Sequence, residues 1–99
     1  MKEMDMVYGI TLQIEAKGPG IYISGHNVEG AINILSKHGD IYEEMKWKAM
    51  EILKSAQECN AILREIRSDR EKGKLNISFE FESWENFLGF REKMKELSH

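Results

Sequence analysis

The chain has 99 residues, 41% of them hydrophobic and 31% charged, a composition typical of a single globular domain (1–99) and not of a disordered segment. Its formal net charge of −3 excludes a surface that is basic enough overall to bind nucleic acid without sequence preference. A single cysteine, Cys59, excludes an internal disulfide, and the apolar runs are too short to span a membrane. With no secretory signal pattern at the start, we expect a cytoplasmic protein.

Hydrophobic and polar residues alternate over residues 7–16, and the alternation resumes at 21–24. Successive side chains of a strand point to opposite faces, so this pattern predicts two strands that each bury one face. The sequence Gly-Pro-Gly at 18–20 separates the two strands. We therefore expect them to pair as a β-hairpin around that turn.

Two helices are predicted after this hairpin. Asn27 is a favourable N-cap for a short helix that ends near Gly39, and Asp40 with Glu43 matches a capping box for the next helix. No glycine or proline occurs over 41–72. Hydrophobic residues there recur at steps of four and three: Met45, Ala49, Ile52, Ala56, Cys59, Leu63 and Ile66. We therefore predict one long central helix that ends at Gly73 and is about 45 Å long.

The strand predicted over 75–82 has the most regular alternation in the sequence. Ser83 is then a favourable N-cap for a last helix. The fold class predicted from these elements is α+β, in the order β-β-α-α-β-α. It has a three-stranded antiparallel sheet (the N-terminal hairpin plus strand 75–82) packed by helices, one of them the long central helix.

The turn that contains Gly25, His26 and Asn27 is a candidate ligand site. Gly25 and Gly30 have the spacing that begins a phosphate-binding loop, but Ala31-Ile32 stands where the lysine and the hydroxyl residue of that motif belong. A tight turn into a helix is one interpretation. The alternative is a nucleotide or small polar ligand held by the free N–H groups at the helix start.

Residues that support catalysis or metal binding are scarce. His38, Asp40, Glu43 and Glu44 form the only cluster of histidine and carboxylates, and it lacks the three or four paired ligands that zinc normally requires. Cys59 falls on the apolar side of the long helix, where a thiol is usually unreactive. We predict no metal, no cofactor and no enzymatic activity.

Arg64, Arg67 and Arg70 recur at steps of three near the end of the predicted long helix. Acidic residues alternate with these arginines, so much of the positive charge can be neutralised locally. This pattern fits a solvated helix end. The alternative is a strip that contacts nucleic acid or an acidic protein.

Trp47, Met50 and Lys54 form the candidate protein interface. On a helix of about 100° per residue, Trp47 points nearly opposite to the apolar side that runs through Ala49 and Ile52. Either the preceding short helix covers Trp47, or Trp47 anchors an interface, where tryptophan is enriched among hot spots.

The function predicted from the sequence is that of a small non-enzymatic regulator, of the inhibitor or adaptor type, that binds other proteins. We also expect a homodimer built on the long helix and aided by strand pairing, because that helix is too long for its own sheet to cover. The alternatives are a nucleotide-binding module that uses the turn at Gly25–Gly30 and a nucleic-acid-binding regulator that uses the three arginines.

Overall fold

The computed structural model describes residues 7–15, 20–37, 43–69 and 71–97. Strands and helices alternate in blocks along the chain, and this confirms the α+β class. The elements are β1 (Tyr8–Glu15), β2 (Tyr22–Ser24), α1 (Val28–Ser36), α2 (Glu43–Glu58), β3 (Ile62–Asp69), β4 (Lys74–Phe81) and α3 (Trp84–Leu97).

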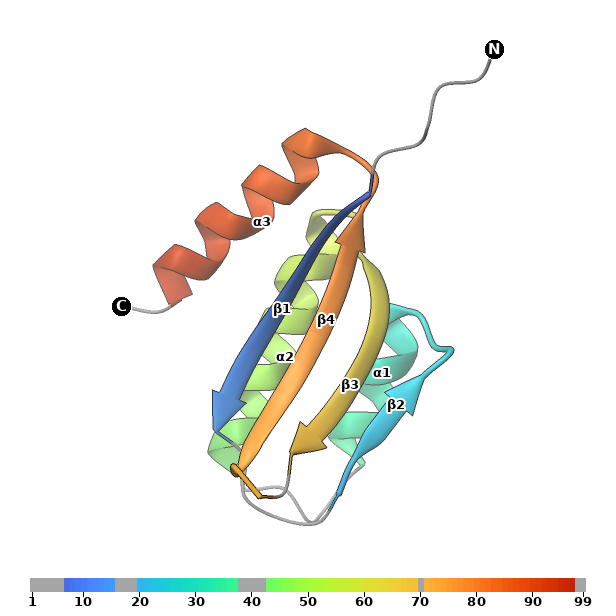
Figure 1. Cartoon of the computed structure of the whole chain (residues 1–99), viewed down its shortest axis with the longest axis vertical. Coiled ribbons are helices and arrows are strands. Elements are labelled where there is room, and N and C mark those ends of the chain that lie inside the picture. Colours follow the sequence, from blue (N-terminus) through green and yellow to red (C-terminus); the bar gives the residue numbers. More distant parts are fainter. Residues whose placement is uncertain (1–6, 16–19, 38–42, 70, 98–99) are drawn as a thin grey trace.

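The four strands form one antiparallel sheet in the order β1-β4-β3-β2 (Figure 1). β3 and β4 make a hairpin at its centre, around a turn in which the Asp69 carboxylate accepts the Lys72 N–H at 3.2 Å. Gly73 follows with a φ of 65°, which favours glycine. β1 pairs with β4 without interruption, and β2 pairs with β3 over three residues.

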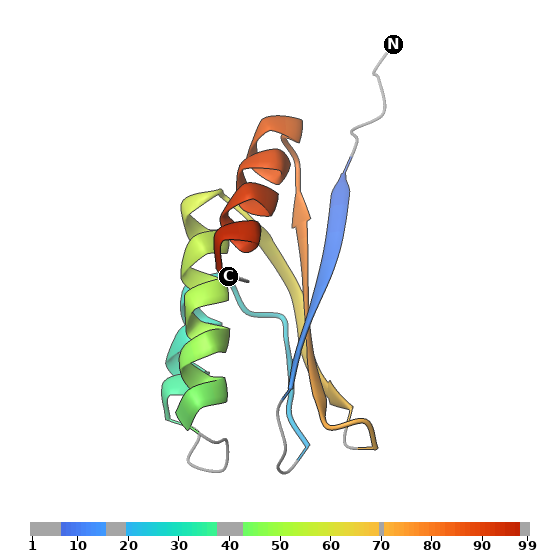
Figure 2. The ribbon, with the colours of Figure 1, turned by 90° about the vertical axis from the view of Figure 1, so that its left-hand side faces the viewer.

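All three helices lie on one side of the sheet, and no helix of the described residues covers its other, open face (Figure 2). The core lies between the two layers. β4 supplies its centre, because each side chain of that strand that points toward the helices is buried: Leu75, Ile77, Phe79 and Phe81. Burial of large apolar side chains is the main stabilising term of a domain of this size.

Aromatic side chains hold α3 against the sheet. Phe90 of α3 packs on Phe79 and Phe81, with ring centroids 5.4 and 5.2 Å apart. Nearer the start of α3, Phe87 contacts Phe81, and Trp84 contacts Tyr8 of β1. Contacts of this tilted or edge-to-face kind add to the free energy that area burial provides.

The predicted three-stranded sheet with an N-terminal hairpin is wrong. β1 and β2 are both strands, as predicted, but they lie at opposite edges of a four-stranded sheet and do not pair with each other. The central β3–β4 hairpin separates them. Each edge strand therefore finds its partner in the C-terminal half of the chain, which alternation within 7–24 cannot reveal.

The predicted long helix is also wrong, because α2 ends at Glu58 and the chain then turns into β3. The Ala61 N–H donates to the Ala56 carbonyl at 2.9 Å, and the Asn60 N–H donates to the Gln57 carbonyl at 3.1 Å. With Asn60 in the left-handed region at a φ of 58°, this is a Schellman motif. An asparagine therefore ends the helix in place of the expected Gly73. The homodimer predicted from the long helix is therefore no longer supported by the length of that helix.

Two predicted helix starts are confirmed. The Asn27 side chain accepts the Gly30 N–H at 2.7 Å at the start of α1, and Ser83 Oγ accepts the Asn86 N–H at 3.2 Å at the start of α3. The strand predicted over 75–82 is β4. Gly39 and Asp40, predicted to end one helix and to begin the next, lie outside the described residues.

Candidate functional site

α2 carries a row of exposed side chains on the side opposite its buried residues. This α2 outer row recurs at steps of three and four and consists of Glu44, Trp47, Glu51, Lys54 and Glu58. Trp47 is 62% exposed, the largest fraction among the exposed large hydrophobic side chains of the described residues. The preceding helix α1 therefore does not cover Trp47, and the interpretation of Trp47 as a core residue is wrong.

A groove with a volume of about 680 Å³ lies beside Trp47, between α2, α3 and the end of β1. The two helices are joined near the end of α2, where Lys93 Nζ lies 2.9 Å from Glu58 Oε1. The C-terminal end of α3 diverges from α2 (Figure 1). The apolar residues that line this α2–α3 groove, besides Trp47, are Ile14, Ile52, Met94 and Leu97, and the polar ones are Gln13, Glu44, Lys48 and Glu51.

The three residues predicted as a protein interface all lie on α2. Trp47 and Lys54 belong to the outer row, and Met50 is half-buried. Sequence reasoning missed the acidic members of the outer row, although their helical spacing from Trp47 is visible in the sequence. It also missed the groove residues from β1 and α3, which are far from Trp47 in sequence and come near it only through the fold.

The predicted ligand turn is engaged in ending β2 and starting α1. Gly25 has a φ of 75°, which suits glycine, and His26 is exposed. The Asn27 side chain already accepts the Gly30 N–H. Glu29 places a negative charge in the first turn of the helix, which disfavours a bound anion. The geometry therefore favours the interpretation as a tight turn.

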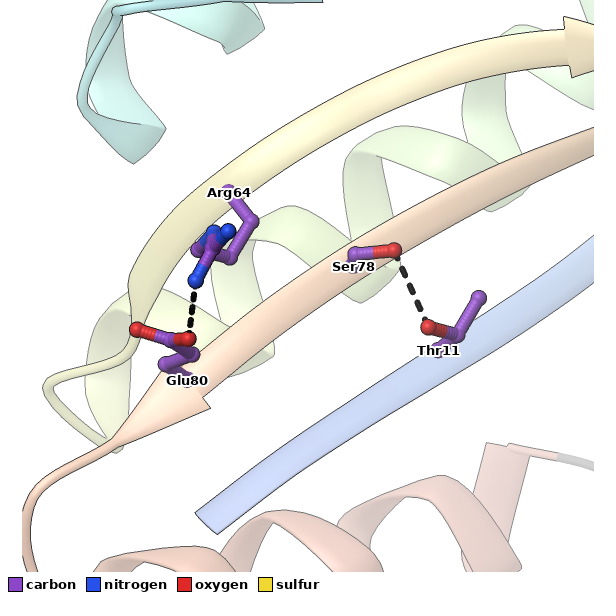
Figure 3. A network of polar contacts seen from close by, with 4 residues as sticks. All are labelled: Thr11, Arg64, Ser78 and Glu80. Atoms are coloured by element: carbon purple, nitrogen blue, oxygen red, sulfur yellow. Dashed lines mark hydrogen bonds and ion pairs between the residues drawn. The ribbon is translucent and has the colours of Figure 1, made fainter. Parts of the chain in front are cut away.

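Arg64 and Arg67 lie on β3, on the open face of the sheet, and not on a helix as predicted. Arg64 forms an ion pair with Glu80 of β4 (Figure 3). The Arg67 guanidinium carbon lies 5.1 Å from the centre of the Tyr22 ring, and its Nη2 atom is 3.4 Å from the Glu65 carboxylate. Each arginine therefore has a carboxylate partner. Arg70 lies outside the described residues.

The open face contains a hollow of about 510 Å³ beside Arg64. Its floor includes a hydrogen bond between the hydroxyls of Thr11 and Ser78, 3.0 Å apart (Figure 3). The residues that line it include Gly9, Tyr22, Ser24, Arg64, Glu65 and Glu80. The ion pairs leave this hollow without the excess of positive charge that phosphate binding requires.

Within the described residues, no three histidine, cysteine or carboxylate side chains gather into a group that could hold a metal ion. His38 and Asp40 of the predicted cluster lie outside those residues. Cys59 is buried, and burial raises the pKa of its thiol, with the Lys93 ammonium opposing this effect. A raised pKa reduces the thiolate that a nucleophilic cysteine needs.

No helix in the described part of the chain is both long enough and apolar enough to cross a membrane. Comparison with protein-family models, with curated proteins and with solved structures finds no match to this chain.

Proposed function

We propose that this protein acts without catalysis, by binding another polypeptide chain through the α2 outer row and the adjoining α2–α3 groove. The observation that carries the proposal is the position of Trp47, a large aromatic side chain that is 62% exposed at the edge of a partly apolar groove. Such a protein works as a regulator, inhibitor or adaptor, because its effect comes from occupying a surface of its partner.

Burial of Trp47 in a complex supplies the free energy for this binding. Water leaves the indole ring when a partner covers it, and transfer of apolar area out of water is the main favourable term in protein association. Met94 and Leu97 extend the apolar area on the α3 side of the groove. Glu44, Lys48 and Glu51 surround it with charge, as in the polar rim of a protein interface.

The nucleic-acid alternative has less support, because Arg64 and Arg67 are both held by carboxylates on the open face. The nucleotide alternative has less support as well, because the Asn27 side chain caps α1 and Glu29 lies beside it.

Photo-cross-linking tests the proposal. A benzophenone amino acid replaces Trp47 in one variant and Tyr22 in a matched control. Tyr22 is 61% exposed but lies on the open face of the sheet, so the two probes differ in position and not in exposure. After irradiation in an extract of the source cells, we expect a discrete adduct from position 47 and none from position 22.

Competition completes the experiment. Excess unlabelled protein is expected to suppress the adduct at position 47, and excess Trp47→Ala variant is expected not to. Adducts of equal yield from both positions, or competition by Trp47→Ala as effective as by the unsubstituted chain, would contradict the proposal.

A further inference from the structure

We infer that the chain bound by the α2 outer row is a second copy of this protein, with the two α2 helices packed antiparallel about a two-fold axis. This inference rests on the proposed function and names its partner. Because the predicted long helix is wrong, the evidence for this dimer is the spacing and the charges of the outer row.

The outer row has the geometry of a helix-pairing surface. Its members recur at steps of three, four, three and four from Glu44 to Glu58, which is the spacing of the a and d positions of a heptad. Trp47 is the one apolar member, so the contact depends on this ring and on charge pairing. They stand on the side of α2 opposite the buried residues Ala49, Leu53 and Ala56. A second helix can therefore lie along this row without disturbing the core.

Charge selects the orientation of the second copy. In an antiparallel pair, one register places Glu44 opposite Lys54 of the second copy and Trp47 opposite Glu51 of the second copy. The two-fold axis repeats both contacts, so two Glu–Lys pairs flank a centre that contains both indole rings. In a parallel pair in register, each charged side chain of the outer row would lie beside the same residue of the second copy. The two like charges would repel each other.

A second antiparallel register would place Glu51 opposite Lys54 and Trp47 opposite Glu58. It would place Glu58, which forms an ion pair with Lys93 at 2.9 Å, against the uncharged Trp47 ring of the second copy. It would also place the two Trp47 rings at opposite ends of the contact. The first register leaves Glu58 outside the contact and brings the two rings together at its centre, so it is the one we propose.

The dimer is expected to be weak. α2 has 16 residues, so it is about 24 Å long and about 10 Å wide. A contact of this size is smaller than the roughly 800 Å² per partner of a standard stable interface. Self-association is therefore expected to depend on concentration, with a dissociation constant between about 1 μM and 1 mM.

Charge reversal with sedimentation velocity tests this inference. We expect Glu44→Lys alone, or Lys54→Glu alone, to weaken dimerisation about tenfold, because each creates two like-charge contacts across the two-fold axis. The double variant Glu44→Lys plus Lys54→Glu restores opposite charges and is expected to dimerise within about threefold of the unsubstituted protein. All of these side chains are exposed, so folding is checked by thermal unfolding of each variant.

A matched double variant, Glu51→Lys plus Lys54→Glu, distinguishes the two registers. It restores opposite charges only in the second register, so we expect it to remain as weak as Lys54→Glu alone. Rescue by this variant, or a dimer that none of the charge reversals weakens, overturns the proposed pairing.

The inferred homodimer can be wrong while the proposed function is right. A protein that sediments as a monomer up to about 1 mM has no significant self-association and overturns the inference. If the probe at position 47 then still captures a different protein, with competition that needs Trp47, the proposed function stands. If position 47 also captures nothing, both fail.

Discussion

Leu63 and Ile66 are both buried in the core, although they are three positions apart in the same strand. In a regular strand, residues at this separation point to opposite faces of the sheet. The register of β3 against β4 shifts between Leu63 and Glu65, so that Arg64 is an additional residue on β3. This β-bulge returns Ile66 to the inner face and turns Arg64 toward Glu80 on the open face.

The bulge gives a first prediction. Leu63→Ala and Ile66→Ala are each expected to lower the free energy of unfolding by about 2–5 kcal/mol, because each leaves a cavity in the core. Ile62→Ala is the matched control, since Ile62 is in the same strand but is 43% exposed. Urea unfolding measures all three, and a loss at Ile62 as large as that at Ile66 would show that the register of β3 is different.

The bulge also explains why the segment after Glu58 reads as helix in the sequence. Because the bulge adds one residue, the two inward side chains of β3, Leu63 and Ile66, are three positions apart in sequence. Together with Cys59, four positions before Leu63, they have the spacing of hydrophobic residues in a helix. The regular strand β4 was predictable because Leu75, Ile77 and Phe79 alternate without a bulge. Periodicity identifies an element only where the element itself is regular.

The end of α2 gives a second prediction. Asn60 has a φ of 58°, which costs an ordinary L-residue about 1–2 kcal/mol and costs glycine nothing. We expect Asn60→Gly to keep or slightly raise the free energy of unfolding, and Asn60→Val to lower it by at least about 1 kcal/mol. If valine is tolerated as well as glycine, the chain does not turn at Asn60 and α2 continues beyond Glu58.

Cys59 gives a prediction about pH. Burial raises the pKa of its thiol above the ordinary value of 9.0, and Glu58 adds to this effect while Lys93 opposes it. The folded protein therefore holds the thiol proton more tightly than the unfolded chain does. The resulting stabilisation is present below about pH 9 and is lost as the pH rises through the folded-state pKa.

The comparison that checks this sign is between the unsubstituted protein and Cys59→Ala. Alanine leaves a cavity but does not titrate, so the difference in unfolding free energy between the two proteins is expected to shrink as the pH rises above 9. A difference that stays constant or grows over this range would mean that the thiol is not protected by burial.

The open face gives a fourth prediction. The Arg64 side chain is 60% exposed, so its ion pair with Glu80 is screened by water and salt. A double-mutant cycle with Arg64→Ala and Glu80→Ala is expected to give a coupling energy below about 1 kcal/mol that falls as salt is added. A coupling of several kcal/mol would indicate that this face is covered in solution.

Part of the candidate site could be predicted from the sequence and part could not. Trp47 and Lys54 could be predicted because both lie on α2, and the spacing of residues in a helix is enough to show which side of it each one occupies. The groove residues Ile14 and Leu97 were missed because their contact with the site depends on strand order and on the placement of α3. The position of Arg64 and Arg67 could not be predicted because their segment is a strand, β3, and not the end of a helix.

Acrylamide quenching of tryptophan fluorescence measures how far Trp47 is exposed to solvent. The chain has two tryptophans, so Trp84→Phe leaves Trp47 as the sole indole, and phenylalanine keeps an aromatic ring beside Tyr8. We predict that acrylamide quenches Trp47 fluorescence strongly in dilute protein, and that quenching falls as the protein is concentrated and a second copy covers the ring. Weak quenching even in the most dilute samples would place Trp47 inside its own subunit and would contradict the account.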